Sequence, residues 1–586
     1  METNQVLDKL PKHLMSLVID QPYNAYTMQD QAVWRYVMRQ NVKHLARVAH
    51  HSYIEGLKRT GISIDSIPRM YGMNRILSEI GWAAVAVDGF IPPSAFMEFQ
   101  AHNVLVIAAD IRSINQIHYT PAPDIIHEAA GHAPIIADPE YAAYLRLFGY
   151  YGSKAFSSKR DYQIYEAIRH LSILKADPYT PISDIKKAEQ ILAGLEQYLN
   201  DPSEMAQLRN LHWWTVEYGL VGELGKPKIY GAGLLSSIGE SFNCLKPHVR
   251  KLPYSIETVK YNFDITTQQP QLFVTPDFAN LMDVLEEFAS GMALKTGGVS
   301  GLVKAVDSGA PATAVYKSGL QVCGTFSEVI SAEGEVEYIR TIGPTILCFN
   351  GKILPGHGLD YHRDGFGSPV GKLKGHDGSL ESFSDIELVN SGIVVGQRVE
   401  LEFESGVRVV GQLKSLTREE GKLIIITFDE CMVTLRDLVL FLPAFGLYDM
   451  GVGEKIVSIY AGPADAAAFD LSYPIPSEKT HKIRHTSNAL LLHELYQQVN
   501  TIRNNDYNLS TIEELWKIVI NKYPDEWLLT LEIYEILVLN DYQALAAVVK
   551  NHLDQISKGN PDTRKLIHDG IQLLHPDNLV VSNSEQ

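Results

Sequence analysis

The hydrophobic pattern of this chain changes its period near residue 300. Before that point apolar residues recur every three or four positions, which is typical of α-helices that bury one face. After it, glycine-rich turns such as GGVSG and DSGAP separate short β-branched runs, and from about residue 481 the helical period returns. We therefore expect a multidomain protein with a mainly α domain containing short strands, then a β-rich module, then a C-terminal α-helical region.

The expected domains span residues 1–300, 301–475 and 476–586. A length of 586 residues accommodates all three, because one domain takes roughly 100 to 200 residues. The first long helix is expected to begin after Thr27, where T-M-Q-D is typical of a helix N-terminus. In the second region the alternation from Val399 to Phe403 and the run from Leu423 to Phe428 predict a small, mostly antiparallel β module or barrel.

Composition and charge exclude several classes of protein. The chain carries 51 Lys and Arg against 69 Asp and Glu, a net charge of −18, which argues against nucleic acid as a partner. No run of about 18 apolar residues and no signal-peptide pattern appears, so we expect no membrane span and a cytoplasmic location. The four cysteines lie far apart and form no C-x-x-C pair, which fits a reducing compartment.

The informative chemistry begins in PAPDIIHEAAGHAPII, residues 121–136, where His127 and His132 stand five residues apart. In an α-helix five residues advance about 140°, which points the two side chains in different directions. Both imidazoles reach one metal if the helix ends between them, and Gly131 followed by Pro134 has the composition of such an end. In the alternative without a metal, His127 is a core residue and His132 a helix-end residue.

A single acid, Glu217, lies in the apolar and aromatic stretch LHWWTVEYGL. A buried carboxylate needs a partner, so Glu217 either ligates a metal with the histidines, forms an ion pair or faces solvent. Two neutral imidazoles with one carboxylate leave open coordination positions, as in non-haem Fe(II) sites for oxygen chemistry. Three protein ligands with a water also suit catalytic zinc, so a zinc-dependent hydrolase stays open as an alternative.

Four motifs in register carry a resemblance to a known family. They are YTPAPDIIHE at 119–128, GHAP at 131–134, WWTVEYGL at 213–220 and YGAGLLSS at 230–237. Through them, residues from about 20 to 295 resemble the catalytic domain of the pterin-dependent aromatic amino acid hydroxylases, the family of phenylalanine, tyrosine and tryptophan hydroxylases.

The resemblance implies that residues 1–300 form a monooxygenase that hydroxylates the ring of an aromatic amino acid. The implied cofactors are Fe(II) and a tetrahydropterin, which is tetrahydrobiopterin or a related compound, with O2 as co-substrate. Conversion of L-phenylalanine to L-tyrosine is the expected reaction, by analogy with the simpler phenylalanine enzymes.

The resemblance also implies roles for individual residues. The implied iron ligands are His127, His132 and Glu217, and no catalytic residue beyond them is implied. The implied substrate residues are Arg112, Thr120, Trp213, Gly233 and Ser236, and the implied pterin residues are Gly89, Phe90, Ile91, Phe96 and Glu128. Arg112 suits its role because its planar fork matches a carboxylate, and Phe96 because a flat apolar ring stacks on a bicyclic one.

The chain departs from the family pattern at several positions. Ala129 and Ala130 replace larger apolar residues between the histidines, and Tyr218 stands where Phe is common. Residues beyond about 300 match nothing in the family, so we expect any self-association or protein partner to use that half. A catalytically silent ligand-sensing scaffold is a further alternative to the enzyme.

A second histidine pair occurs in PGHGLDYHRDG, where His357, His362 and Asp364 have the residue types of a metal site. They lie in a glycine-rich turn region without a partner motif. The preferred interpretation is therefore a polar loop.

Overall fold

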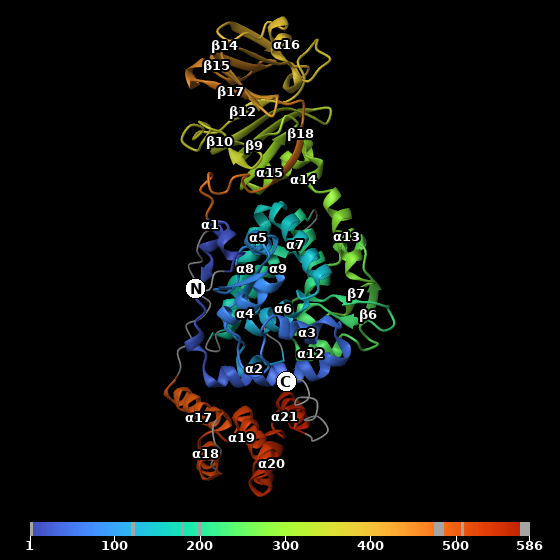
Figure 1. The fold of residues 1–586 in the computed structure, drawn as a ribbon, viewed down its shortest axis with the longest axis vertical. Helices are drawn as coiled ribbons and strands as arrows, with labels where there is room; N and C mark the ends of the chain where they lie inside the picture. The colour runs from blue at the N-terminus through green and yellow to red at the C-terminus, as the bar shows by residue number, and fades with distance from the viewer. Residues whose placement is uncertain are drawn as a thin grey trace.

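The computed structural model describes residues 4–118, 123–176, 180–196, 202–265, 267–473, 486–504 and 509–574. The molecule is elongated: the strands of residues 311–461 lie at one end, the N-terminal helices in the middle and the last helices at the other end (Figure 1). It contains many helices and several sheets, in the order expected from the change in hydrophobic period. No described helix is long and apolar enough to cross a membrane.

The predicted helix start at Thr27 is confirmed. Helix α2 (Met28–Val48) begins with a capping box, in which the Thr27 side chain accepts from the Asp30 N–H and the Asp30 carboxylate accepts from the Thr27 N–H. These bonds satisfy donors that a helix N-terminus otherwise leaves unpaired. Trp34 and Val37 on α2 are fully buried, because helices pack on this helix from opposite sides (Figure 1).

Helices and two small sheets make up residues up to 308. The helices are α1 (Lys12–Met15), α3 (Ser52–Arg59), α4 (Met70–Leu77), α5 (Pro93–Ala101), α6 (Ala133–Ile135), α7 (Pro139–Lys154), α8 (Lys159–Ala176), α9 (Ile182–Glu196), α10 (Glu204–His212), α11 (Ala232–Leu235), α12 (Ile238–Asn243), α13 (Phe278–Ser290), α14 (Ala293–Thr296) and α15 (Gly298–Ser308). The 3-10 turns are η1 (Leu7–Lys9), η2 (Tyr23–Ala25), η3 (Ser78–Ile80), η4 (Ile114–Gln116) and η7 (Ile256–Lys260), and two π-helical segments are η5 (Ile126–His132) and η6 (Trp213–Glu217).

The strands of this half are short. One sheet has the order β1-β2-β3, and the other has the order β5-β4-β7-β6. The strands are β1 (Val18–Ile19), β2 (Ala83–Val87), β3 (Val104–Ala108), β4 (Leu220–Val221), β5 (Lys228–Ile229), β6 (Arg250–Pro253) and β7 (Gln271–Thr275). Every residue of β2 and β3 is buried, which accounts for their continuous apolar sequences.

Residues 311–461 form two antiparallel sheets, so the predicted antiparallel pairing is confirmed. The six-stranded sheet contains β8 (Pro311–Tyr316), β9 (Leu320–Ala332), β10 (Glu335–Phe349), β11 (Lys352–Ile353), β12 (Gly367–Pro369) and β18 (Ile456–Ala461). The five-stranded sheet contains β13 (Arg398–Glu402), β14 (Val407–Glu419), β15 (Lys422–Leu435), β16 (Leu438–Phe441) and β17 (Tyr448–Gly451), with η8 (Leu380–Ser382), α16 (Asp385–Asn390) and η9 (Pro443–Phe445) beside them.

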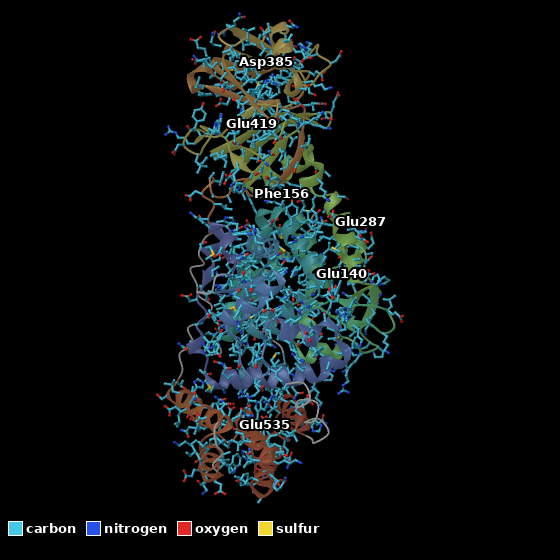
Figure 2. The ribbon with its side chains drawn as sticks, in the orientation of Figure 1. Glu140, Phe156, Glu287, Asp385, Glu419 and Glu535 are labelled. Carbon is cyan, nitrogen blue, oxygen red and sulfur yellow. The ribbon has the colours of Figure 1, made fainter. Side chains whose placement is uncertain are left out.

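An apolar junction joins the helical body to the six-stranded sheet. Phe156, from the end of α7, is buried in one cluster with Leu302 of α15 and with the inner face of the sheet (Figure 2). The sheet therefore rests on helices α14 and α15.

The last helices pack against α2 (Figure 1). They are α17 (Ser487–Asn504), α18 (Leu509–Lys522), α19 (Trp527–Leu539), α20 (Gln543–Ile556) and α21 (Pro561–Leu573). Their apolar side chains belong to the same core as the N-terminal helices. The Tyr36 hydroxyl of α2 donates to the backbone oxygen of Leu566 over 2.7 Å, so the contact includes specific hydrogen bonds.

Candidate functional site

His127 and His132 lie on the π-helix η5, and this corrects the expected helix end between them. The backbone runs on from η5 into α6, with the Ala133 N–H donating to the Glu128 carbonyl, five residues back. In a π-helix residues five apart lie on the same face. The two imidazole Nε2 atoms are therefore 3.2 Å apart although an α-helix would separate them.

Glu217 closes the triangle from a second π-helix, η6, whose end is marked by the Tyr218 N–H donating to the Trp213 carbonyl. Its two carboxylate oxygens lie 3.2 Å from His127 Nε2 and 3.2 Å from His132 Nε2. Ligand atoms that share one first-row metal at about 2.1 Å are roughly 3 to 3.5 Å apart. The three side chains therefore have the spacing of a facial metal-binding set.

The electrostatics agree with a cationic partner for Glu217. Burial alone would raise its pKa, but the imidazoles of His132 and His127 hold the pKa of this carboxyl well below its usual range. Glu128 also approaches His132, at 3.8 Å, but burial raises the pKa of Glu128 to about 8. Of the two acids beside the histidines, Glu217 is thus the closer one and the ionised one.

Ser236 fixes the tautomer of His127. The Ser236 hydroxyl donates to the Ala232 carbonyl at 2.7 Å, and its oxygen lies 3.1 Å from His127 Nδ1. Because the hydroxyl proton is engaged, Nδ1–H is the donor to Ser236, and the lone pair of Nε2 faces the metal position.

Two glycines let helix α11 come close to the ligand-bearing segments. A Cβ at Gly131 of η5 would lie 2.7 Å from the Ala232 oxygen, and one at Gly233 would lie 2.9 Å from the Tyr218 ring. Both approaches exclude any larger side chain. The predicted substrate residue Gly233 therefore packs against the turn that carries Glu217.

Arg112, predicted to bind the substrate carboxylate, is buried and held by Asp124. Its Nε and Nη2 groups each donate to a different oxygen of Asp124 at 2.8 Å. Nη1 donates to the Ser236 carbonyl at 3.4 Å. Burial would raise the pKa of Asp124, but Arg112 keeps it below its usual range.

The sequence missed Asp124, which supports both Arg112 and His127. Its Oδ1 also accepts from the His127 backbone N–H at 3.0 Å. An Asp three residues before His127 is a helix-capping signal, and this signal could have identified it.

Of the two remaining predicted substrate residues, the structure describes Trp213 but not Thr120. Trp213 stacks between two rings, with centroids 4.6 Å from Tyr218 and 4.2 Å from Phe263. Its indole Nε1 has no hydrogen-bond partner among the described residues. Thr120 lies outside the described residues.

The predicted pterin residues surround the start of α5. Gly89 has φ +69°, a conformation that favours glycine, and it begins the loop through Phe90 and Ile91. The Phe90 carbonyl accepts from the Tyr165 hydroxyl at 3.2 Å. Phe96 on α5 lies 5.9 Å, ring to ring, from His212 at the end of α10.

His212 is a third histidine near the metal position, and no sequence motif pointed to it. Its Nδ1 lies 3.9 Å from Glu217 Oε1, and burial lowers its pKa to about 4. His212 and Glu217 are five residues apart across η6, so the π-helix brings them to one face. The neutral ring links the predicted pterin face of Phe96 to the ligand Glu217.

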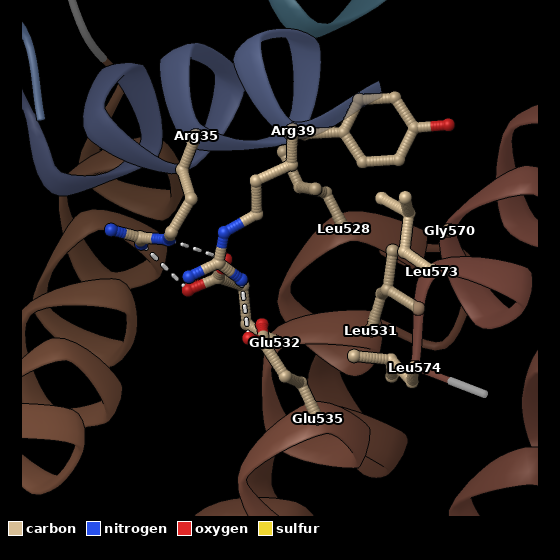
Figure 3. Close-up of a pocket in the computed structure, with 10 residues that line it drawn as sticks. Arg35, Arg39, Leu528, Leu531, Glu532, Glu535, Gly570, Leu573 and Leu574 are labelled. Atoms are coloured by element: carbon tan, nitrogen blue, oxygen red, sulfur yellow. Dashed lines mark hydrogen bonds and ion pairs between the residues drawn. The ribbon is translucent and has the colours of Figure 1, made fainter. Parts of the chain in front are cut away.

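A small cavity lies elsewhere, between α2 and helices α19 and α21 (Figure 3). Its volume of about 30 Å³ matches one water and not a substrate or a pterin. Arg35 and Arg39 on its wall form ion pairs with Glu532 and Glu535 (Figure 3). These charges serve the contact between helices.

Comparisons with known proteins identify relatives of the first half of the chain. A family model described as biopterin-dependent aromatic amino acid hydroxylase matches residues 19–158 and 151–296. Phenylalanine-4-hydroxylase of Mesorhizobium japonicum is 29% identical over 266 residues, which cover 44% of this chain and 80% of that protein. Phenylalanine-4-hydroxylase of Chromobacterium violaceum is 28% identical over 277 residues, covering 45% and 78%.

A solved structure is also similar. The crystal structure of the Chromobacterium violaceum phenylalanine hydroxylase, with bound iron(III) and 7,8-dihydrobiopterin, is 26% identical, covers 50% of this chain and 91% of that chain, and has a TM-score of 0.38. The match of residues 19–296 to the family model and the curated relatives confirms the resemblance seen in the motifs. Residues 19–296 thus form a domain of the biopterin-dependent aromatic amino acid hydroxylase family.

Proposed function

We propose that residues 1–300 catalyse hydroxylation of the ring of an aromatic amino acid with Fe(II), O2 and a tetrahydropterin. The main support is the geometry of His127, His132 and Glu217, whose potential ligand atoms lie 3.2 Å apart in each of the three pairs of residues. The curated relatives named phenylalanine-4-hydroxylase support L-phenylalanine to L-tyrosine as the reaction.

His127, His132 and Glu217 would hold the iron on one face and leave the opposite positions open. When bound, iron and pterin together supply the electrons that split O2. The protein's own contribution is orientation: Ser236 fixes the His127 tautomer, and Asp124 fixes the start of η5. Burial of these groups excludes water from the reacting centre.

Arg112 would bind the carboxylate of the amino acid. A guanidinium has five N–H donors, and three of them are engaged by Asp124 and the Ser236 carbonyl. The remaining donors stay available for the substrate, with Asp124 fixing the plane of the fork. Thr120 and Trp213 complete the proposed substrate set with Gly233 and Ser236.

The pterin would lie against Phe96 and the Gly89–Phe90–Ile91 loop. Glu128 would face its polar edge. Burial raises the pKa of Glu128 to about 8, and a carboxyl in its protonated form offers both a donor and an acceptor.

Product analysis tests this function. Protein purified under anaerobic conditions is incubated with Fe(II), a tetrahydropterin and O2, with phenylalanine, tyrosine and tryptophan in separate reactions. We expect a ring-hydroxylated product, tyrosine from phenylalanine foremost, and iron as the bound metal. His127→Ala should lose both, whereas Glu140→Gln, an exposed acid on α7 (Figure 2), should keep both.

The alternatives predict different results from the same protein. Bound zinc and no hydroxylation would favour the hydrolase. A fully iron-loaded protein that yields no product with any of the three amino acids would favour the silent scaffold and would contradict the proposal.

We further propose that the chain divides into the catalytic domain, a β-rich module of residues 301–475 and a helical region of residues 476–586. The helical region would act chiefly as a cover for α2. The Arg35 guanidinium, 5% exposed, donates to both oxygens of Glu532 at 3.0 and 2.7 Å. Any protein partner or second copy of the chain would then bind elsewhere on the C-terminal half.

Truncation tests the role of the cover. A chain that ends after residue 475 exposes the apolar face of α2 and removes the acid that pairs with Arg35. We expect it to aggregate or to unfold at a lower temperature than the full chain. A soluble, iron-loaded and fully active 1–475 protein would contradict the cover and would make the last helices an independent module.

We also propose a cytoplasmic location. The four cysteines, Cys244, Cys323, Cys348 and Cys431, are all buried free thiols, as a reducing compartment permits.

A further inference from the structure

A second cluster of two histidines and one acid lies between the two antiparallel sheets. His357 and His362 come from the loop that follows β11, and Asp449 lies on β17. His357 Nδ1 is 3.0 Å from His362 Nε2. With one Asp449 oxygen, the three potential ligand atoms all lie within 4.8 Å of one another.

Both histidines are fixed to the same strand by backbone hydrogen bonds. The His357 carbonyl accepts from the Leu347 N–H, and the His362 carbonyl accepts from the Thr345 N–H, each at 3.1 Å. Leu347 and Thr345 belong to β10, in the six-stranded sheet. The loop therefore presents its two imidazoles from a defined backbone position although its sequence reads as turns.

Asp449 reaches the histidines from the other sheet. It lies opposite Thr427 of β15, whose hydroxyl donates to Asp449 Oδ1 at 2.6 Å. This bond holds the carboxylate in place, and the Tyr361 hydroxyl also interacts with it. The cluster thus brings together side chains from both sheets.

The charge of Asp449 lacks a cationic partner. Asp449 is only 6% exposed and His362 only 8%, and no lysine or arginine of the described residues forms an ion pair with Asp449. A buried carboxylate is costly unless a cation or several hydrogen bonds compensate it. His357 is half-buried and Tyr361 beside it is exposed, so an ion can reach the cluster from solvent.

We propose that His357, His362 and Asp449 bind a divalent first-row transition cation, for which Zn²⁺ is the probe, and that this cation ties the loop to β17. Imidazole nitrogen and carboxylate oxygen are ordinary zinc ligands, and water completes a tetrahedral set of three protein ligands. The histidine nitrogens already have the required spacing of roughly 3 to 3.5 Å. Asp449 supplies the third potential ligand atom.

This site differs from the one that the sequence offered. Asp364, the acid of the PGHGLDYHRDG motif, is exposed and lies 3.5 Å from the guanidinium of Arg363. The distant Asp449 takes its place. The preferred polar-loop interpretation overlooked the cluster because the third residue comes from another strand.

The test is Zn²⁺ titration of the full-length chain, stripped of metal by a chelator and followed by calorimetry and elemental analysis. A His127→Ala/Glu217→Ala background removes the first site. We expect one tight Zn²⁺ per chain in this background, and at least a 100-fold loss of affinity on adding His357→Ala, since loss of an outer partner alone costs 10- to 100-fold. Asp449→Asn, which keeps the size of the side chain and the acceptor for Thr427, should act likewise.

Two control variants each remove a side chain of the same kind, an imidazole or a carboxylate, outside the proposed site. His376→Ala removes a half-buried imidazole of the same region, and Asp364→Asn removes the motif's exposed acid. Both should keep the tight site. Circular dichroism of each variant reports folding, so that lost binding in a folded Asp449→Asn protein counts even if His357→Ala does not fold.

Two results would overturn the proposal. One is a background protein with no tight Zn²⁺. The other is a tight Zn²⁺ whose affinity His357→Ala and Asp449→Asn leave within threefold of the background value, which would reduce the cluster to a hydrogen bond between two histidines.

Discussion

Two histidine clusters among the described residues have the same spacing along the chain but lie on different kinds of backbone. His127 and His132 stand five residues apart, as do His357 and His362, and in each case a distant acid joins them. The first pair lies on a π-helix, with 3.2 Å between the two Nε2 atoms and 3.2 Å from each of them to one of the two oxygens of Glu217. The second lies on a turn-rich loop, with 3.0 Å between His357 Nδ1 and His362 Nε2. The same five-residue spacing therefore brings two imidazole nitrogens together on two kinds of backbone. One is a π-helix, and the other is a loop held to β10 by backbone hydrogen bonds.

The two clusters also differ in their outer partners. In the first, Ser236 and Asp124 both fix His127. In the second, Thr427 fixes Asp449, while the histidines are held through their backbones. The first cluster is thus more fully preorganised, and it is the one that lies within residues 19–296, which match the family model.

The largest expected effect is the loss of iron and of hydroxylation when the acid of the first cluster is removed. Glu217→Ala removes a proposed ligand of the first one. We expect iron content to fall below about a tenth of the wild-type value and hydroxylation to fall more than 100-fold, because loss of outer partners alone costs 10- to 100-fold. Elemental analysis and product assays measure both. Retention of iron and turnover would show that Glu217 forms only ion pairs.

The next effect concerns the support beneath the first cluster. Asp124→Ala leaves Arg112 buried without an acid and removes the acceptor of the His127 N–H. We expect a loss of about 3 to 5 kcal/mol of unfolding free energy, measured by denaturant titration. Asp65→Ala is the control, since Asp65 is 58% exposed beside Arg39 and its pair is worth about 0 to 1 kcal/mol. Equal losses would mean that burial of the Arg112 pair is not decisive.

A smaller effect tests whether outer partners matter equally in both clusters. Ser236→Ala frees His127 Nδ1 and should weaken iron binding by about 10- to 100-fold, measured by competition with a chelator. Thr427→Val frees the Asp449 carboxylate in the same way and should weaken Zn²⁺ binding at the second cluster. An unchanged iron affinity in Ser236→Ala would show that the His127 orientation is fixed by other contacts.

The smallest effect comes from a buried acid that lacks imidazole neighbours. Burial raises the pKa of Glu240 on α12 to about 7, whereas the histidines lower that of Glu217. Because the folded state holds the Glu240 proton more tightly, its contribution to stability is full below about pH 4.5 and is lost as the pH rises through about 7. The loss is at most about 1.4 kcal/mol per pH unit in that window.

Glu240→Gln should remove this part of the pH dependence. Denaturation of wild type and variant at pH 5 and pH 7.5 gives the comparison, and the wild type should lose more stability between the two conditions. Parallel pH profiles would place the Glu240 carboxyl in a better hydrated environment than its burial indicates.

Local signals predicted much of the fold. The T-M-Q-D start of α2 is read directly from sequence because a capping box involves residues three apart. The change of period near residue 300 likewise predicted where helices give way to antiparallel strands. From the five-residue spacing of His127 and His132 we predicted a helix end instead of a π-helix. The same sequence is compatible with either structure, so the spacing could not distinguish them.

By itself the sequence determined the family, the ligand residues proposed for iron and the order of helical and β regions, since motifs and hydrophobic periods are local. Only the tertiary structure decided that η5 and η6 are π-helices, that Asp124 holds Arg112, and that Asp449 joins His357 and His362. It also decided that the last helices cover α2 through Arg35 and Glu532. The physical reason is separation along the chain: contacts between residues dozens or hundreds of positions apart depend on packing that no local pattern records.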